Sequence, residues 1–415
     1  MTQLLSLREA RAAVLCAASE LETTEAVGLH EACGRVLAVD VRSAGPWPAT
    51  DRSAMDGFAV VAGAAGIAAG ATLPVVGESL AGRPFEAELI PGNAIRIMTG
   101  AVVPSGADAV VPVELTSGYA GARVTLVEGA RRGGNIRLRG SELPEGAMVL
   151  RCGTRIRPAE IGVLAVLGHG QITVRRRPEV AILSTGDEVV PLEASPAPHQ
   201  VRDSNSHALA AQVASAGAVP VRLGIARDTI EDTTERMVKG LATCDVLLTI
   251  GGISEGTHDL VQDRLIELGV QKVFQGIALK PGKPTFFGWR ENAGRRQYVF
   301  GLPGNPASCF TVFDLLVLPL LQRILGESVG QLPAAGGALI SGAAFKSNKR
   351  LQAIPARIAL CAGAQVEAEL GAPKTSGDPF SLCAGNGYVL IPENAVVGAA
   401  TVAEIALYEG RLQPR

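Results

Sequence analysis

The chain has 415 residues, of which 47% are hydrophobic, 19% are charged and 4% are aromatic, and its formal net charge is −2. Such a chain is long enough for several domains, and its hydrophobic content excludes a disordered protein. The balanced charge and the lack of a long basic run argue against a nucleic-acid-binding protein, because the densest basic cluster, residues 175–177, reads as a strand end or turn.

The seven cysteines are an odd number and contain no C-x-x-C pair. This usage indicates reduced thiols in a cytosolic protein rather than a disulfide scaffold or a zinc site. The N-terminal apolar stretch contains acids and arginines, which a signal peptide would not. The most apolar stretch, residues 315–325, is short for a membrane span and contains Pro319. We therefore expect a cytoplasmic protein that does not cross a membrane.

The first half of the chain predicts a helical region interrupted by a β domain. Apolar residues at helical spacing predict an amphipathic helix over residues 6–22 and a second, short helix over 30–37. Short β-rich runs between Gly/Pro turns follow, and a helix is predicted at 159–167. We expect residues 1–45 and 149–178 to form an N-terminal helical and mixed domain, with residues 46–148 inserted as a small β domain.

Strand-like and helix-like segments alternate from about residue 179. Alternation at this spacing predicts a doubly wound, mostly parallel sheet with helices on both faces, which we assign to residues 179–328. Short strands and glycine turns return over residues 329–415 and predict a small C-terminal β domain. The expected fold class is therefore α/β plus β, in an elongated multidomain chain.

The most informative stretch is the turn Lys280–Pro284, which is followed by the turn Gly301–Pro306 and then by a long apolar helix. Proline fixes φ, and glycine lets the backbone approach a ligand closely. The N-terminus of a helix adds unpaired N–H groups and partial positive charge. Two lysines on such a turn predict a site for a phosphate-like or oxyanion ligand.

Polar turns follow several of the predicted strands, and ligands of open α/β sheets bind at the carboxyl ends of the strands. Carboxylates beside phosphate-binding groups indicate a divalent metal, most often Mg²⁺. We predict that Glu188, Asp228 and Asp259 hold this metal. Other residues of the same edge are predicted to bind the anionic ligand, namely Ser184, Thr185, Gly251, Gly252, Ser254, Lys280, Lys283, Pro284, Pro303 and Pro306.

Each of these turns also has a purely structural interpretation. Asp259 can complement a helix dipole, Asp228 can act in a capping region, and Glu188 can be a solvated loop acid. In the β domain, Asp56 and Thr99 lie near glycines, where local turn chemistry explains them better than a ligand does when they are judged alone. The joint placement of the turns along one sheet edge favours a functional site.

The chain resembles the MoeA family of molybdopterin molybdenumtransferases, which includes the E domain of gephyrin-like proteins, over nearly its whole length up to about residue 325. The resemblance implies a MogA-like α/β domain and a homodimer whose site lies between the α/β domain of one chain and the inserted β domain of the other. It rests on motifs that occur in order, namely Ser53–Gly57, Arg96–Ala101, Gly106–Val110, Asn135–Arg137, Ser184–Glu188, Asp203–Asn205, Gly251–Ser254, Lys280–Pro284 and Gly301–Pro306.

The reaction that the resemblance implies converts adenylylated molybdopterin and molybdate into molybdenum cofactor and AMP, with Mg²⁺ as cofactor. The implied partners besides a second copy are the molybdopterin adenylyltransferase and molybdoenzyme maturation factors. Lys280, Lys283 and Pro284 would face the anion, and Pro303 and Pro306 would shape the pocket. Carried over by motif, the catalytic residues would be Asp56, Thr99, Glu142, Glu188, Asp228 and Asp259.

The sequence departs from the family pattern at several positions. Ser141 and Glu142 replace a Glu-Asp pair, Gly276 stands where a basic residue is common, and Glu255 replaces a small apolar residue. An arginine expected near residue 355 is Pro355, with Arg357 nearby, and the family's serine matches either Ser376 or Ser381.

These departures remove positive charge or oxyanion contacts, so an alternative function stays open. It is that of a catalytically altered paralogue that binds molybdopterin as a carrier or maturation factor. A scaffolding protein that uses the dimer, and an enzyme acting on sugar or nucleotide phosphates, are further alternatives.

Overall fold

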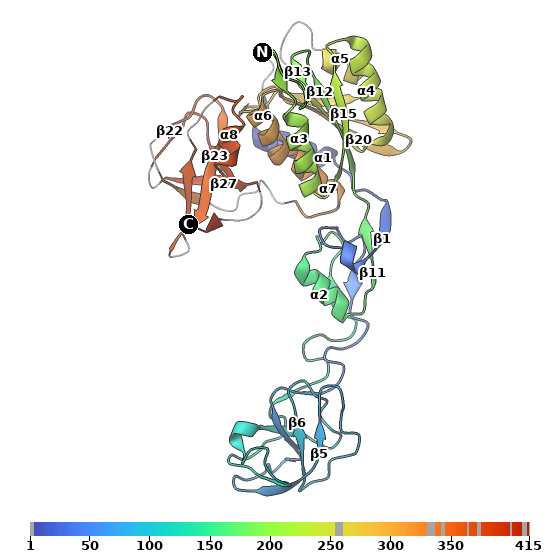
Figure 1. Ribbon diagram of the computed structural model, residues 1–415, viewed down its shortest axis with the longest axis vertical. Helices are drawn as coiled ribbons and strands as arrows, with labels where there is room; N and C mark the ends of the chain where they lie inside the picture. The colour runs from blue at the N-terminus through green and yellow to red at the C-terminus, as the bar shows by residue number, and fades with distance from the viewer. Residues whose placement is uncertain are drawn as a thin grey trace. The chain divides into compact units, whose positions relative to one another are not determined.

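The structure is a computed structural model (Figure 1). The chain divides into a large unit, made of Met1–Val39, Cys152–Gly162 and Gly170–Arg415, and an inserted unit, made of Asp40–Arg151 and Val163–His169. The division into four domains stays a prediction. The structure describes residues 4–253, 260–329, 337–341, 345–362, 365–371, 375–398, 401–408 and 413–414.

A six-stranded mixed sheet forms the centre of the large unit, with the strand order β15-β12-β16-β20-β19-β17. The first four strands run parallel to one another, and β19 is antiparallel to both of its neighbours. A two-stranded pair, β13 (Val189–Val190) with β14 (Val201–Arg202), lies outside this sheet. The strands of the sheet are β12 (Glu179–Thr185), β15 (Val219–Ala226), β16 (Val246–Ile250), β17 (Gln271–Gln275), β19 (Phe286–Asn292) and β20 (Arg295–Leu302).

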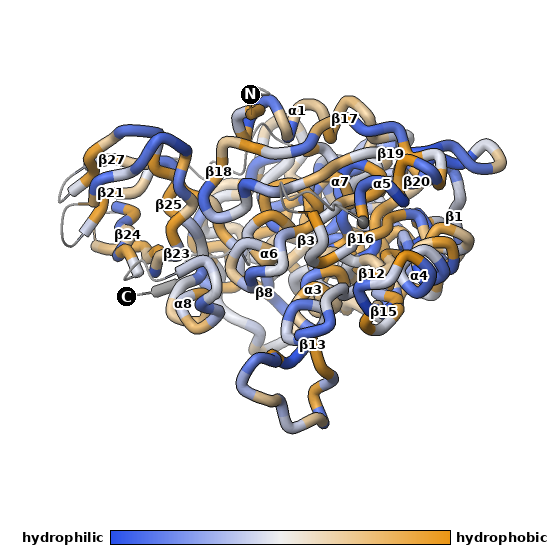
Figure 2. Tube along the Cα trace, turned by 90° about the horizontal axis from the view of Figure 1, so that it is seen from above, coloured by the Kyte–Doolittle hydropathy of each residue, from blue (hydrophilic) through white to orange (hydrophobic). Residues whose placement is uncertain are grey.

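Helices cover both faces of this sheet because successive side chains of its buried strands point to opposite sides. In β12, Val180 and Ile182 pack with α1 (Leu7–Ala17), α3 (Asn205–Ser215), α6 (Pro306–Val312) and α7 (Leu318–Ile324). Ala181 and Leu183 pack with α4 (Ile230–Thr243) and α5 (Leu260–Glu267). Hydrophilic and hydrophobic residues alternate along α4 (Figure 2), as expected for a helix with one face on a sheet. The predicted α/β sheet with helices on both faces is confirmed, although the sheet is mixed.

The longest apolar helix of the described residues runs without interruption from Pro306 to Ile324. Its 19 residues are long and apolar enough to cross a membrane, but 72% of the apolar window is buried inside the large unit. The long apolar helix that the sequence predicts after the turn Gly301–Pro306, over residues 307–325, is therefore confirmed. A π-helical segment, Phe313–Val317, directly precedes α7 and lets the helix accommodate Pro319, which lacks an N–H donor. This helix is therefore a core element of the large unit.

The C-terminal region closes into a five-stranded barrel, because the long strand β23 (Leu351–Leu360) pairs with both β24 and β25. The closed order is β23-β24-β21-β27-β25, and β18 (Leu279–Lys280) pairs with the start of β23 from outside the ring. The lysine turn is thereby hydrogen-bonded to the barrel. The remaining elements are β21 (Gly337–Ser341), β22 (Phe345–Lys346), β24 (Val366–Leu370), α8 (Phe380–Cys383), β25 (Gly387–Ile391), β26 (Val396–Val397), β27 (Val402–Leu407) and β28 (Gln413–Pro414).

The inserted unit contains a five-stranded sheet with the order β7-β4-β6-β5-β8 and two short strand pairs, β10 with β2 and β3 with β9. Phe58, Val60 and Val111 lie in its hydrophobic core. The predicted small β fold of this segment is confirmed. Its strands are β2 (Val41–Arg42), β3 (Arg52–Ser53), β4 (Gly57–Val60), β5 (Thr72–Ser79), β6 (Ala94–Ile97), β7 (Ala109–Pro112), β8 (Arg123–Thr125), β9 (Ile136–Arg137) and β10 (Met148–Leu150).

The N-terminal segments differ from the sequence expectation. The first helix ends at Ala17, and β1 (Thr24–Gly28) follows it and pairs with β11 (Gln171–Arg175). The helix predicted over 30–37 is only a 3-10 turn, Leu29–Glu31, because Val36 and Leu37 pair in extended bridges instead. The predicted helix at 159–167 is confirmed as α2 (Pro158–Val166).

Candidate functional site

Two adjoining cavities lie at the predicted edge of the α/β sheet, and Pro284, Pro303 and Asn305 line both of them. The first, of about 670 Å³, extends to the barrel, and the second, of about 870 Å³, lies over the strand ends. We call the first the cationic pocket, lined by Lys280, Lys283, Lys346, Arg350, Ser376, Ser381 and their neighbours. We call the second the acidic pocket, lined by Ser184, Thr185, Gly186, Glu188, Asp203, Asp228, Gly251, Gly252, Pro306 and their neighbours.

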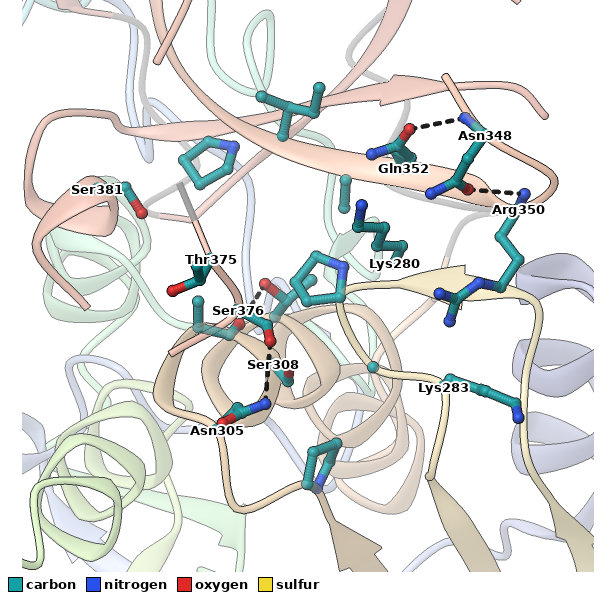
Figure 3. Close-up of a pocket in the computed structure, with 18 of the residues that line it drawn as sticks. Lys280, Lys283, Asn305, Ser308, Asn348, Arg350, Gln352, Thr375, Ser376 and Ser381 are labelled. Atoms are coloured by element: carbon teal, nitrogen blue, oxygen red, sulfur yellow. Dashed lines mark hydrogen bonds between the residues drawn. The ribbon is translucent and has the colours of Figure 1, made fainter. Parts of the chain in front are cut away.

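The cationic pocket carries four basic side chains, and no Asp or Glu is among the described residues that line it. Hydroxyl and amide groups complete the lining, including Ser308, Thr375 and Gln352 (Figure 3). Such a set offers many donors and concentrated positive charge, which is what an oxyanion requires. The predicted anion site at Lys280 and Lys283 therefore coincides with a real cavity.

The lysine turn is held in shape by hydrogen bonds of its own residues. Thr285 Oγ1 donates to Gly282 O at 2.7 Å, and Ile277 N donates to Lys283 O at 3.0 Å. The Lys280 side chain is exposed at the end of β18. Because these bonds fix the backbone, the two lysines leave the turn at fixed positions and need little ordering when a ligand binds.

The start of the long helix connects both pockets to the barrel. Asn305 Nδ2 donates to Ser376 Oγ at 2.9 Å, and Ala307 N donates to Ser376 O at 3.2 Å. Ser381 Oγ donates to Asp378 O at 3.1 Å, whereas Ser376, among the described residues, gives its own hydroxyl proton to none. Both serines line the cationic pocket, and Ser376 has the donor that a ligand could accept.

Two exposed carboxylates, Glu188 and Asp228, line the acidic pocket. Two reciprocal hydrogen bonds hold Asp228 in place, each from a backbone N–H to a carboxylate. Asp187 N donates to Asp228 Oδ2 at 3.3 Å, and Asp228 N donates to Asp187 Oδ1 at 3.2 Å. Gly186 has φ +127°, and a Cβ there would lie 2.5 Å from Glu188 Oε2. A side chain at residue 186 would therefore displace the Glu188 carboxylate.

The buried carboxylate Asp203 organises the floor of the acidic pocket. It accepts hydrogen bonds from Ser184 Oγ at 2.9 Å, from Ser206 N at 3.1 Å and from Ser206 Oγ at 2.6 Å. Thr185 Oγ1 donates to Ile250 O at 3.0 Å. Both hydroxyls predicted to bind the ligand thus use their protons to hold the strand ends together, and they can meet a ligand only as acceptors.

The oxygen ligands in the acidic pocket suit Mg²⁺, which proteins often bind with one or two carboxylates together with phosphate oxygens and water. Glu188 and Asp228 supply two such groups. No cluster of three His, Cys, Asp or Glu side chains forms a metal site in the part of the chain that the structure describes. Ser254, Glu255 and Asp259 lie outside the described residues. The set of three carboxylates stays a prediction, and two of its members fit the ion.

Comparison with known proteins decides the family. Residues 5–168 match the MoeA N-terminal region (domain I and II), and residues 181–323 match a probable molybdopterin binding domain. The chain is 35% identical, over 374 residues, to the molybdopterin molybdenumtransferase of Nostoc sp., covering 89% of this chain and 85% of that relative. The chain belongs to the MoeA family.

Further relatives agree with this assignment. The molybdopterin molybdenumtransferase of Bacillus subtilis is 32% identical, over 89% of this chain and 86% of its own length. The crystal structure of a molybdopterin biosynthesis moeA protein from Pyrococcus horikoshii OT3 is 30% identical, with a TM-score of 0.83, and covers 98% of this chain and 100% of that one. The multidomain α/β architecture described above is thus the MoeA architecture.

Three of the residues carried over from the MoeA motifs lie in the inserted unit. Asp56 Oδ1 accepts from Thr99 N at 2.7 Å and from Thr99 Oγ1 at 2.8 Å, and these bonds lower the pKa of the Asp56 carboxyl. Glu142 forms an ion pair with Arg137. The side chains of these three residues and of Arg137 are exposed. Their roles in catalysis stay predictions, but Asp56 is held ionised and oriented by its own fold.

The structure explains one departure from the MoeA pattern directly. Gly276 has φ +84°, a conformation that strains any other residue, and a Cβ there would lie 2.8 Å from Leu4 Cδ2, so a basic residue would strain the backbone and displace the Leu4 side chain. Pro355 lines the cationic pocket without charge, and Arg357 is exposed and lies outside that lining.

Sequence reasoning missed four residues, Lys346, Arg350, Asp187 and Asp203. The first two lie beyond residue 325, where the motif match is poor. Asp187 and Asp203 lie inside the motifs Ser184–Glu188 and Asp203–Asn205. Their place in these motifs was the signal that could have identified them.

Proposed function

We propose that this chain transfers molybdenum from molybdate to adenylylated molybdopterin and releases AMP. Membership of the MoeA family over 89% of the chain makes it a molybdopterin molybdenumtransferase, a transferase of molybdenum cofactor biosynthesis. The observation that supports the finer statement is the pair of adjoining pockets of opposite charge.

The cationic pocket suits molybdate as a substrate. Molybdate is a tetrahedral dianion, and lysine, arginine and hydroxyl donors hold such ions without any bond to the metal. Lys280 enters from the lysine turn, and Ser376 offers a hydroxyl from the barrel side. No cysteine is among the described residues of either lining, so the dithiolene sulfurs of molybdopterin are the thiol ligands that would receive the molybdenum.

The acidic pocket suits the diphosphate that joins molybdopterin to AMP. Bound Mg²⁺ would neutralise phosphate oxygens there, which is the chemistry that two carboxylates beside a phosphate require. Glu188 and Asp228 would hold the ion, while the turn at Gly251 and Gly252 lets backbone approach the substrate. Attack of a water molecule on one phosphorus of the diphosphate would form a new P–O bond, break the bond from that phosphorus to the bridging oxygen, and release AMP together with the phosphorylated pterin. The shared lining at Pro284, Pro303 and Asn305 keeps both reacting groups next to each other.

The remaining expectations complete the proposal. The active form is a homodimer in which the Asp56–Thr99 cluster of a second copy faces the pockets. The protein acts in the cytoplasm, in reach of the molybdopterin adenylyltransferase that supplies its substrate and of maturation factors that accept its product. Chemical cross-linking and the mass in solution test the dimer directly.

The deciding experiment is an assay of AMP release from adenylylated molybdopterin with and without molybdate and Mg²⁺. We expect release that depends on both. Tight binding of molybdopterin without molybdate-dependent release would instead support the altered paralogue, which the loss of the arginine at Pro355 favours.

A further inference from the structure

We propose that Arg350 is the arginine that binds the molybdate in this chain, in place of the arginine that the family pattern puts near residue 355. The inference rests on the proposed function, because it names the group that recognises the tetrahedral dianion from the barrel side. Lys346 lies in the same lining and adds charge from β22.

The Arg350 guanidinium is directed to the cationic pocket by one hydrogen bond, from Nη1 to Leu279 O at 3.2 Å. Its side chain extends from the barrel toward the turn that carries Lys280 and Lys283 (Figure 3). The other guanidinium nitrogens have no partner within the residues described, and neither Lys280 nor Arg350 forms an ion pair there. The arginine is thus oriented and half-buried, with N–H donors left for a ligand.

The strand register explains why Arg350 and Lys280 meet. β18 and β23 pair with Leu279 opposite Leu351 and Lys280 opposite Gln352, so Arg350 comes immediately before the paired segment. The backbone around it is fixed as well, since Arg350 N donates to Asn348 Oδ1 at 3.1 Å and Asn348 N donates to Gln352 Oε1 at 3.0 Å. The short loop between β22 and β23 therefore presents Arg350 from a constrained backbone.

The other candidate arginine does not fit this role. Arg357 lies in β23 opposite Glu369 of β24, with an exposed side chain and no place in the pocket lining. Pro355 contributes only apolar surface. An arginine five residues earlier in the chain, brought in from the loop instead of the strand, restores the charge that Pro355 removes.

A binding experiment with matched variants tests the assignment. Calorimetric titration of molybdate and of tungstate into the full chain is repeated with Arg350→Gln, Arg350→Lys and Lys349→Gln. Lys349 is the adjacent, exposed residue outside the pocket lining, so its substitution removes the same charge from the same loop. We expect oxyanion affinity to fall roughly 10- to 100-fold in Arg350→Gln, to be partly restored in Arg350→Lys, and to be unchanged in Lys349→Gln.

The assay of AMP release provides the second readout. If Arg350 binds the anion, the KM for molybdate rises in Arg350→Gln by a similar factor, and the KM for adenylylated molybdopterin does not. Unchanged oxyanion affinity in Arg350→Gln, or an equal rise in both KM values, would overturn the inference while the proposed function stands. A wild-type chain that binds neither oxyanion and releases no AMP would overturn both.

Discussion

The cationic and acidic pockets share three lining residues but differ in charge and in origin. The acidic pocket is built from turns at the carboxyl ends of β12 and β16, with Asp228 after β15. The cationic pocket combines the lysine turn with residues of the barrel, including Arg350. Under the proposed function, the sheet edge would bind the metal and the diphosphate, and the joint with the barrel would bind the oxyanion. Each pocket should therefore respond to its own substitutions.

The largest expected effect is in the acidic pocket. The double variant Glu188→Gln with Asp228→Asn should lower molybdate-dependent AMP release by about 1000-fold, because it removes both carboxylates that fit Mg²⁺. It should leave tungstate affinity unchanged, which a titration checks. Glu193→Gln, an exposed acid outside both linings, is the matched control. Loss of tungstate binding in the double variant would break the division between the pockets.

The next largest effect is expected on the pH dependence of stability, at the contact between the long helix and the barrel. Asp314, on the long helix, accepts from Gln212 Nε2 at 2.9 Å and from Tyr388 OH of β25 at 3.0 Å. Burial raises the pKa of the Asp314 carboxyl from 3.8 to about 7. The folded chain therefore keeps a proton that the unfolded chain has lost, and stability falls as the pH rises from about 4 to 7.

Asp314→Asn removes this titration, so its stability should depend less on pH than that of the wild type. The difference should build up to roughly 4 kcal/mol across this window. Urea unfolding at a series of pH values measures it, with tyrosine absorbance as the signal, since two of the four tyrosines, Tyr388 and Tyr408, lie on the barrel side. Parallel pH profiles for the two proteins would show that Asp314 titrates normally.

Lys280→Gln is expected to affect the cationic pocket alone. Its loss should weaken molybdate binding roughly 10- to 50-fold, since one charged donor is removed from a site that the structure surrounds with cations. The Mg²⁺ concentration for half-maximal AMP release should not change. Lys272→Gln, on β17 and outside the lining, serves as the control. A changed Mg²⁺ requirement would mean that the two pockets are coupled.

Gly186→Ala is the mildest test, and it acts on the acidic pocket. The new methyl group would meet the Glu188 carboxylate and would need a backbone with φ +127°. We expect a loss of about 1–2 kcal/mol in stability and a several-fold higher requirement for Mg²⁺. Tungstate affinity should stay at the wild-type value in the same titration. An unaltered Mg²⁺ requirement would show that the position of Glu188 is not critical.

Two carboxylates of the acidic pocket could be predicted because they follow strands of the sheet, although the buried Asp203 beneath them was missed. Val180–Leu183 is a continuous apolar run, and the rule for open α/β sheets then places Glu188 and Asp228 at one edge. The lysine turn was predictable as well, because proline fixes φ there and glycine lets the backbone approach a ligand closely. The long helix over residues 307–325 was also predicted, but its π-helical segment was not, because a sequence pattern does not distinguish π-helical from α-helical turns.

Arg350 could not be predicted, because its place depends on a pairing between distant segments. Nothing in the residues around 350 indicates that β23 adds to β18, some seventy positions earlier, and such register is fixed only by tertiary packing. The choice between Ser376 and Ser381 depended on tertiary packing in the same way, because only the structure shows the contact of Ser376 with Asn305. Pro355 lines the cationic pocket without charge, and the arginine proposed to act in its place enters from the loop that precedes β23.

A tungstate soak of crystals of the protein, with the tungsten located at its absorption edge, tests directly whether the cationic pocket binds the oxyanion. Tungstate is suitable because it has the shape and charge of molybdate. We expect one strong anomalous peak in the cationic pocket, within hydrogen-bonding distance of Lys280 and Arg350. A peak beside Glu188 and Asp228 instead, or no peak in either pocket at saturating tungstate, would contradict it.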